Sequence, residues 1–151
     1  FDTFILSDGM IGDSLIEAFG KSLNKSFGSL PGSTGKGAGV FTKVAKAAGI
    51  DSSGPYTGES YDAAALIVLA MQAGGSADRS SIAKNVMAVA NGPGKKIYPG
   101  ELKKALDLLA KGKAVDYEGA TGVVFTKVGE AEGSFLEKEI KYGKFKTKKQ
   151  R

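Results

Sequence analysis

Asp8 occupies a position in the sequence that favours ligand binding. It follows the short apolar run at residues 4–6, which predicts a buried strand, and it precedes Gly9 and a helical segment. Ligands of open α/β folds bind at the carboxyl ends of strands, where a carboxylate can pair with a cation such as an ammonium group. Aspartate also serves often as a plain turn residue or helix cap, and the spacing alone favours that structural role.

Tyr56 and two acidic residues are the other candidates for a site. Tyr56 follows Gly54 and Pro55 in a predicted loop, where its ring either lines a binding site or covers a helix end. Glu59 and Asp62 begin the next predicted helix, where acidic side chains most simply complement the helix dipole. Nothing in their spacing indicates a pair of catalytic carboxylates in one cleft.

The sequence excludes several kinds of enzyme chemistry. It has no His and no Cys, which removes the imidazole base, the thiol nucleophile, the disulfide and the usual zinc ligands. A phosphate-binding loop that uses Gly35 and Lys36 would need Gly at position 30 and Ser or Thr at position 37. The sequence has Leu30 and Gly37 there, so the motif does not match. Residues 35–40 begin like a dinucleotide-binding fingerprint, but Val40 stands where the last glycine belongs. In the glycine-rich stretch at residues 92–95, Pro93 lacks the backbone amide that a phosphate would need. We therefore expect no enzyme activity, no catalytic residue, no metal and no cofactor.

Composition and charge argue against nucleic-acid and membrane partners. The 151 residues are 42% hydrophobic and 25% charged, which fits one globular domain of ordinary size. Six of the 21 basic residues lie in residues 141–151, and the remaining 15 are balanced by 16 acidic residues. The net charge of +5 therefore belongs to the C-terminal segment and not to a nucleic-acid-binding face. The longest apolar stretch, residues 63–71, is shorter than the ~20 residues of a membrane span.

The elements that must position these residues are mostly helices. Apolar spacing predicts helices over residues 11–23, 40–48, 59–73, 78–91 and 99–112. The third of these is apolar on every side, which indicates burial over most of its surface. Predicted strands occupy residues 4–6, 26–30, 123–125, 134–142 and 144–148. The last two strands are joined at Tyr142 and Gly143, which is typical of a hairpin.

The predicted strands are too few for the predicted helices. A unit of strand, helix and parallel strand needs a strand on both sides of each helix, and here helices follow one another directly. Residues 1–3 offer neither an initiator Met nor the basic start of a signal peptide, so either a leader was removed or the chain is a piece of something longer. We therefore expect that the chain is part of a larger protein.

Three groups of segments together resemble the substrate-binding proteins of branched-chain amino acid ABC transporters, which are type I periplasmic binding proteins. The segments are residues 4–10 with 13–18, residues 54–56 with 60–64, and residues 94–102 with 112–122. Their order and separations also match, and the similarity extends over nearly all of the chain. Members of this family are much longer, so the chain corresponds to a C-terminal part.

The resemblance implies a two-lobed receptor that closes on its ligand, each lobe a Rossmann-like parallel sheet flanked by helices. It implies that residues 1–52 belong to the second lobe, that residues 53–122 form a mostly helical part of the first lobe, and that residues 123–151 return to the second lobe as strands. The expected fold class is α/β, type I periplasmic-binding-protein-like, with both lobes incomplete.

The resemblance also implies a function and a site. Asp8 matches an acidic position that pairs with the amino group of a bound amino acid, and Tyr56 matches an aromatic position in the pocket for the ligand side chain. The implied protein is a periplasmic receptor, secreted with a signal peptide outside this chain. It delivers a branched-chain or related amino acid to the membrane permease of an ABC importer. Two alternatives stay open: a ligand-sensing regulatory domain of the same fold, and an α/β enzyme domain.

Overall fold

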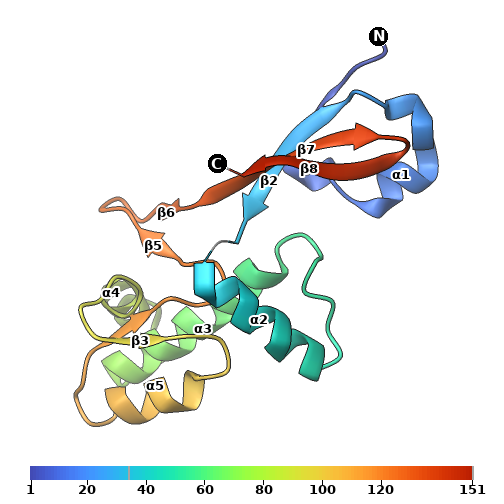
Figure 1. Ribbon diagram of the computed structural model, residues 1–151. Coiled ribbons are helices and arrows are strands. Elements are labelled where there is room, and N and C mark those ends of the chain that lie inside the picture. The colour runs from blue at the N-terminus through green and yellow to red at the C-terminus, as the bar shows by residue number, and fades with distance from the viewer. Residues whose placement is uncertain (34, 151) are drawn as a thin grey trace. The chain divides into compact units, whose positions relative to one another are not determined.

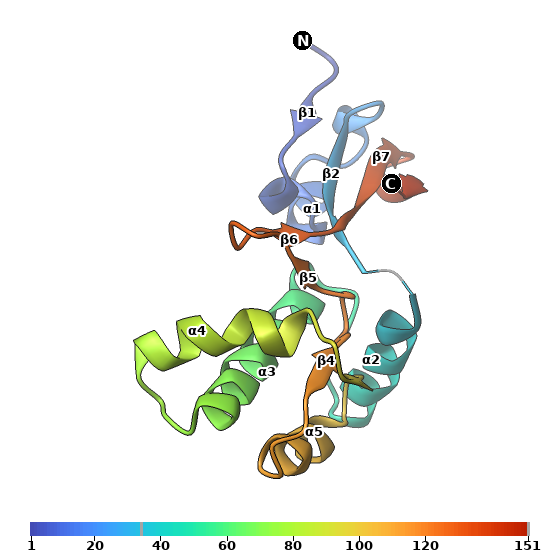
Figure 2. The ribbon, with the colours of Figure 1, turned by 90° about the vertical axis from the view of Figure 1, so that its left-hand side faces the viewer.

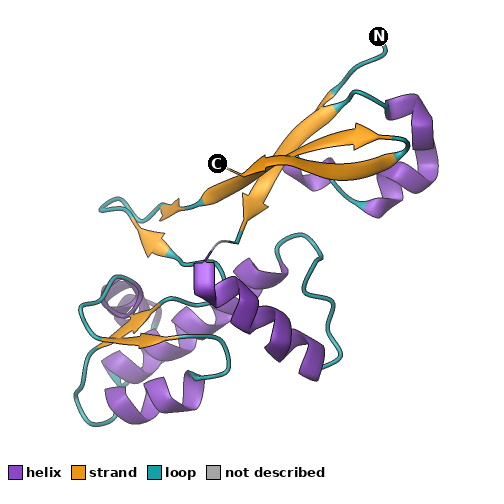
Figure 3. Cartoon of the chain, in the orientation of Figure 1, coloured by secondary structure: helices purple, strands orange, loops and turns teal. Residues whose placement is uncertain are grey.

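The structure is a computed structural model that describes residues 1–33 and 35–150. Contacts divide the chain into two units. Unit 1 comprises Phe1–Gly32, Ser53–Tyr56 and Ser134–Arg151, and unit 2 comprises Ser33–Ser52 and Thr57–Gly133. Figures 1 and 3 show the helices and strands of both units. The assignment of residues 1–52, 53–122 and 123–151 to the lobes of a receptor stays a prediction.

Unit 1 is built on a mixed sheet of four strands in the order β1-β2-β7-β8. β1 (Ile5–Leu6) pairs in parallel with β2 (Phe27–Gly32). β2 pairs antiparallel with β7 (Ser134–Lys141), which pairs antiparallel with β8 (Lys144–Gln150). The sheet therefore joins strands from the two ends of the sequence, and β1 lies at its edge.

The hairpin between β7 and β8 turns at the predicted position. Tyr142 and Gly143 have φ angles of 56° and 68°. A two-residue type I′ turn requires positive φ at both central residues, because only then does its twist match that of the strands. The predicted hairpin is confirmed.

Short helices cover one face of the sheet of unit 1. The 3₁₀ turns η1 (Asp8–Met10) and η2 (Gly20–Leu23) flank the helix α1 (Asp13–Phe19). The predicted single helix over residues 11–23 is wrong, because α1 ends at Gly20, whose φ of 53° interrupts the α-helical backbone. The buried core beneath these elements consists of four aliphatic side chains: Leu6, Ile11, Leu23 and Ile140.

Unit 2 is mainly helical. Its helices are α2 (Gly35–Ala47), α3 (Thr57–Gly74), α4 (Arg79–Ala90) and α5 (Leu102–Leu109). A parallel pair of strands, β3 (Lys95–Ile97) and β4 (Val115–Tyr117), packs with α3, α4 and α5 (Figure 2). An antiparallel pair is formed by β5 (Val124–Phe125) and β6 (Ala131–Glu132). The sequence predicted the helices and β5, but it did not predict β3, β4 or β6.

The core of unit 2 lies between three helices and the β3–β4 pair. Leu69, Ile97 and Tyr117 are fully or almost fully buried there, and burial of each such side chain stabilises the fold by about 1.5–3 kcal/mol. One side of α3 is open to solvent, since Ile67 and Val68 are 47% and 39% exposed. The prediction that this helix is buried over most of its surface is therefore wrong for this chain.

Candidate functional site

Asp8 lies where the sequence analysis predicted, directly after the edge strand of unit 1. It is the first residue of η1, whose backbone is closed by the Met10 amide donating to the Ser7 carbonyl (3.0 Å) and the Ile11 amide donating to the Asp8 carbonyl (3.0 Å). The Gly9 amide donates a hydrogen bond to Oδ1 of Asp8 (2.7 Å). The carboxylate is exposed to solvent.

Tyr56 and Asp8 are brought together by the fold of unit 1. Tyr56 ends the short segment Ser53–Tyr56 that belongs to this unit, 48 positions after Asp8 in the sequence. Its hydroxyl donates a hydrogen bond to the Asp8 carboxylate. This bond, followed by the bond from the Gly9 amide, lowers the pKa of Asp8 below its ordinary value of 3.8, because both donors favour the charged form. The carboxylate is therefore ionised at neutral pH.

The backbone of Tyr56 has an unusual conformation. Its φ angle is 61°, in the left-handed region that bulky residues seldom adopt. The side chain is 40% exposed, so burial of the ring does not account for this backbone. Non-glycine residues in the left-handed region occur often at ligand-binding sites, where the surrounding structure holds them. The left-handed backbone of Tyr56 therefore supports its choice as a candidate binding residue.

The Asp8–Tyr56 pair suits the binding of a cation. An ionised carboxylate accepts hydrogen bonds at several lone-pair positions, and its exposed surface leaves room for N–H donors of a ligand. Charge-assisted bonds of this kind are roughly twice as strong as neutral ones. The low pKa makes the same carboxylate a poor general base at neutral pH. Among residues 1–33 and 35–150, the structure contains no group of acidic side chains able to hold a metal ion.

A second carboxylate, Asp62, has a role that the sequence analysis did not predict. It lies on α3 and is only 3% exposed. Its Oδ1 accepts hydrogen bonds from the Tyr117 hydroxyl (2.8 Å) and the Ala120 amide (2.7 Å). Its Oδ2 accepts from the amide (2.8 Å) and the hydroxyl (2.7 Å) of Thr121. Asp62 therefore fastens the segment after β4 to α3, and the interpretation that it complements the helix dipole is wrong.

The sequence contained a signal for this role of Asp62. Asp62, Leu66 and Leu69 share one face of α3 at helical spacing. An acidic residue on an apolar stripe must be paired when it is buried, so its position already pointed to hydrogen-bond partners elsewhere in the chain. Glu59, in contrast, does lie in the first turn of α3.

Tyr117 completes the buried cluster around Asp62. Burial raises the pKa of Tyr117 far above its usual range, and the negative charge of Asp62 raises this pKa further. Its hydroxyl therefore keeps its proton and serves as a permanent donor to Asp62. The cluster is structural, and the exposed pair in unit 1 is the candidate for ligand binding.

Comparison with known proteins found one protein of similar sequence and one of similar structure. No protein-family model matches the sequence. Over 70 residues the chain is 40% identical to the chemotactic signal transduction system substrate-binding protein BasB of Halobacterium salinarum, a match that covers 46% of this chain and 17% of BasB. The structure is similar to that of the leucine-binding protein LivK of Thermotoga maritima, with a TM-score of 0.66 and 19% sequence identity over 98% of this chain and 37% of LivK.

The similarity to LivK establishes the fold class. The chain has the α/β periplasmic-binding-protein fold, with parallel strand pairs flanked by helices, and the predicted fold class is confirmed. The chain spans much less than the length of either protein, 17% of BasB and 37% of LivK. Both are named as binding proteins. None of the helices within the described part of the chain combines the length and the apolar character of a membrane span.

Proposed function

We propose that this chain is part of a receptor that binds a small α-amino acid without changing it chemically. The Asp8 carboxylate pairs with the ammonium group of the ligand, and the Tyr56 ring lines the pocket for the ligand side chain. The hydrogen bond from Tyr56 to Asp8 carries this proposal, because it keeps an ionised carboxylate at the carboxyl end of β1. The fold shared with a leucine-binding protein supports it further.

The chemistry of the pair favours an ammonium group over other ligands. An anionic carboxylate repels phosphates and carboxylates, and it pairs with a cation that offers several N–H donors. Such a pair strengthens when a receptor closes and excludes water, since the dielectric around the two charges falls. A branched-chain or related aliphatic amino acid is the proposed ligand, because the structural neighbour is named for leucine.

The proposed receptor delivers its ligand to the permease of an ABC importer and acts in the periplasm or outside the cell. The similarity to LivK supports this role. A second candidate is a receptor that reports its ligand to a signalling partner, and the 40% identity to a chemotactic signal transduction protein favours it. Deletion of the gene separates the two: loss of amino acid uptake indicates an importer, and loss of chemotaxis with uptake intact indicates a sensor.

A calorimetric ligand screen tests the proposed binding. The purified receptor is titrated with leucine, isoleucine, valine and alanine, and with glucose and a nucleotide as unrelated compounds. We expect saturable binding of at least one aliphatic amino acid. N-acetyl-leucine is the matched control, since it keeps the side chain and lacks the ammonium group, and it should not bind. Binding restricted to sugars or nucleotides would overturn the proposal.

A further inference from the structure

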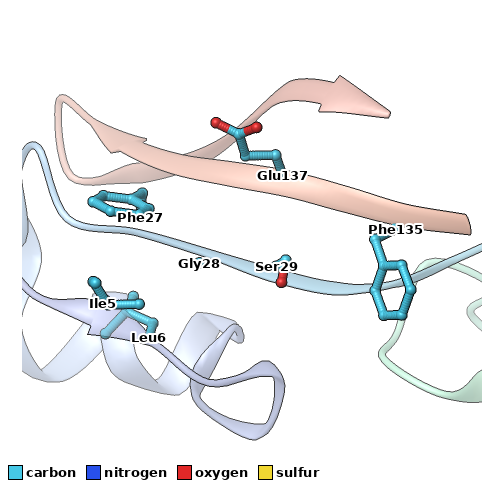
Figure 4. A pocket seen from close by; sticks show the side chains of 7 residues that line it. All are labelled: Ile5, Leu6, Phe27, Gly28, Ser29, Phe135 and Glu137. Atoms are coloured by element: carbon cyan, nitrogen blue, oxygen red, sulfur yellow. The ribbon is translucent and has the colours of Figure 1, made fainter. Parts of the chain in front are cut away.

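Units 1 and 2 differ in the chemistry that their surfaces offer outside the candidate site. The hollow of about 490 Å³ in unit 1 is lined mainly by apolar residues, and Glu137 is the charged residue that Figure 4 shows there. Its carboxylate is already paired with Nζ of Lys148 (3.3 Å). In unit 2, in contrast, α4 is followed directly by Asn91 and Gly92, two residues that can react with each other without an enzyme.

The sequence Asn91-Gly92 is prone to deamidation, because asparagine is a labile residue and glycine has no side chain to hinder the attack. The backbone nitrogen of Gly92 gives its proton to hydroxide and attacks Cγ of Asn91. A C–N bond forms, the bond from Cγ to Nδ2 breaks, and ammonia leaves with a proton returned by water. Water then opens the cyclic imide and yields aspartate or isoaspartate. The net reaction consumes water, releases ammonia and replaces a neutral amide by a carboxylate.

The side chain of Asn91 also fastens β5 to the end of α4. Its Nδ2 donates to the Phe125 carbonyl (2.7 Å), and the Phe125 amide donates to its Oδ1 (2.9 Å). An ionised aspartate has no donor, so it would place a carboxylate oxygen against the Phe125 carbonyl, where both atoms are acceptors. Deamidation therefore removes one of the two hydrogen bonds and sets two acceptors against each other.

The same two hydrogen bonds restrain the reaction while they last. They hold the amide of Asn91 at Phe125, so Cγ is not free to turn to the nitrogen of Gly92. The elements that maintain this contact are small, since β5 and β6 are two residues each and mostly exposed. A hairpin of two such strands is marginally stable and opens locally at a low cost in free energy. A reaction at Asn91 would therefore proceed through the opened form of β5.

We propose that Asn91 is a site of spontaneous deamidation in the native protein, and that the reaction releases β5 from α4 irreversibly. The modification acts on a segment that connects the two units in the sequence. β6 ends at Glu132, and unit 1 resumes at Ser134. Deamidation therefore loosens the polypeptide that leads from unit 2 back to unit 1.

Peptide mapping of the aged protein tests the reaction, with the other asparagines of the chain, Asn24 and Asn85, as internal controls. Asn85 lies inside α4, where its Nδ2 donates to the Ser81 carbonyl (2.8 Å), and Asn24 precedes the bulkier Lys25. The folded protein is incubated in mildly alkaline buffer, digested in acid and analysed by mass spectrometry. We expect conversion at Asn91 before either control. An Asn91 that stays intact, or that reacts no faster than Asn24, would overturn the proposal.

A variant of the turn between β5 and β6 tests whether opening limits the reaction. Oγ1 of Thr126 accepts a hydrogen bond from the Glu130 amide (3.2 Å), and Thr126→Ala removes this bond while Asn91 stays in place. Loss of one hydrogen bond favours the opened form, so we expect deamidation to run about 2- to 10-fold faster. Thr42→Ala is the matched control, since it removes a hydrogen bond to the Ala38 carbonyl (3.1 Å) on α2, and it should leave the rate unchanged. Equal rates in Thr126→Ala and the wild type would contradict the proposed opening.

Hydrogen exchange measures the release of β5. We expect the Phe125 amide to exchange about tenfold faster in Asn91→Asp and in the aged wild type than in the fresh wild type, because acceptor repulsion favours the opened form. Asn24→Asp is the matched control, since Oδ1 of Asn24 only accepts a hydrogen bond, from the Gly143 amide (2.9 Å), and an aspartate keeps that acceptor. It should leave the exchange of Phe125 unchanged. If Asn91→Asp does not fold, the aged wild type decides alone, and unchanged exchange in a deamidated protein contradicts the release.

Discussion

Units 1 and 2 each contain an aspartate that accepts a hydrogen bond from a tyrosine hydroxyl, and the two carboxylates differ in their access to water. Asp8 in unit 1 is exposed and interacts with Tyr56 and the Gly9 amide. Asp62 in unit 2 is buried and accepts four hydrogen bonds from Tyr117, Ala120 and Thr121. The same two residue types thus form a structural clamp where all acceptor positions are occupied, and a candidate binding site where positions stay open.

The positions of the tyrosines in the chain explain part of this difference. Tyr117 ends a strand in the core of unit 2, so regular structure holds its side chain. Tyr56 ends a loop segment and adopts a left-handed backbone. Loops on a folded scaffold often carry binding residues, because their side chains reach solvent and ligand. The predictions below address this contrast, from the largest expected effect to the smallest.

Replacement of Asp62 should cause the largest loss of stability. Asp62→Ala leaves the Tyr117 hydroxyl and the three donors of Ala120 and Thr121 without their buried partner. We expect the free energy of unfolding to fall by about 3–5 kcal/mol, measured by urea denaturation. Glu59→Ala on the same helix is the matched control and should change this free energy by less than about 1 kcal/mol. A small effect of Asp62→Ala would show that the cluster is not a clamp.

Tyr117→Phe should have a smaller effect that depends on pH. The loss of one hydrogen bond to Asp62 should cost about 1 kcal/mol at neutral pH, in urea denaturation. Because the pKa of Tyr117 is raised in the folded state, its contribution is complete below the unfolded-state pKa of about 10 and is lost as the pH rises above it. The wild type should therefore lose stability in alkali by an increment that Tyr117→Phe lacks. Equal alkaline profiles of the two proteins would contradict the burial of this hydroxyl.

Tyr56→Phe should leave stability nearly unchanged and alter the titration of Asp8. The hydroxyl of Tyr56 is the main cause of the lowered pKa of Asp8, so its removal should move this pKa upward, toward 3.8. Titration of the Asp8 carboxyl carbon by NMR measures the change. Tyr142→Phe, in the exposed hairpin turn, is the matched control and should leave the pKa of Asp8 as it is in the wild type. If the titration midpoint of Asp8 were the same in Tyr56→Phe as in the wild type, the hydrogen bond between Tyr56 and Asp8 would be contradicted.

The affinity for the ligand should depend on pH through the ionisation of Asp8. A carboxyl group with a lowered folded-state pKa stays ionised until the pH falls through that value. The affinity of the proposed receptor for leucine should therefore be constant from neutral pH down to about pH 4, and should fall below it. In Tyr56→Phe the fall should begin at a higher pH. A loss of affinity between pH 5 and 7 in the wild type would indicate a titrating group other than Asp8.

The sequence predicted the elements around the exposed aspartate better than the contacts of the buried one. Asp8 at the end of a strand and the hairpin at Tyr142 and Gly143 follow from local patterns, namely an apolar run before a turn and a left-handed turn pair. The hydrogen bond between Tyr56 and Asp8 was not predicted, since the resemblance to a family only assigned both residues to one ligand site. The clamp of Asp62 depends on a segment 55 to 59 positions away, and no local pattern contains such a partner.

The missed strands have a similar explanation. β3 and β4 are three residues each, and β3 begins with the exposed Lys95 and Lys96. So short a segment shows no alternation, and its strand character comes from pairing with a partner that is distant in the sequence. The burial of α3 was overestimated because apolar residues all around a helix predict burial on every side, whereas Ile67 and Val68 are partly exposed.

The affinity of the Asp8→Asn variant for leucine tests the proposed function most directly. The substitution keeps the shape of the side chain and removes its charge. Calorimetry compares it with the wild-type receptor and with Glu17→Gln, which neutralises an exposed carboxylate of α1. We predict that Asp8→Asn weakens binding by about 30- to 5,000-fold, the range for a charge pair that is desolvated in a complex. Glu17→Gln should bind as the wild type does, and the thermal stability of all three unliganded proteins should be nearly equal. Wild-type affinity in Asp8→Asn would remove Asp8 from the site and contradict the proposed receptor.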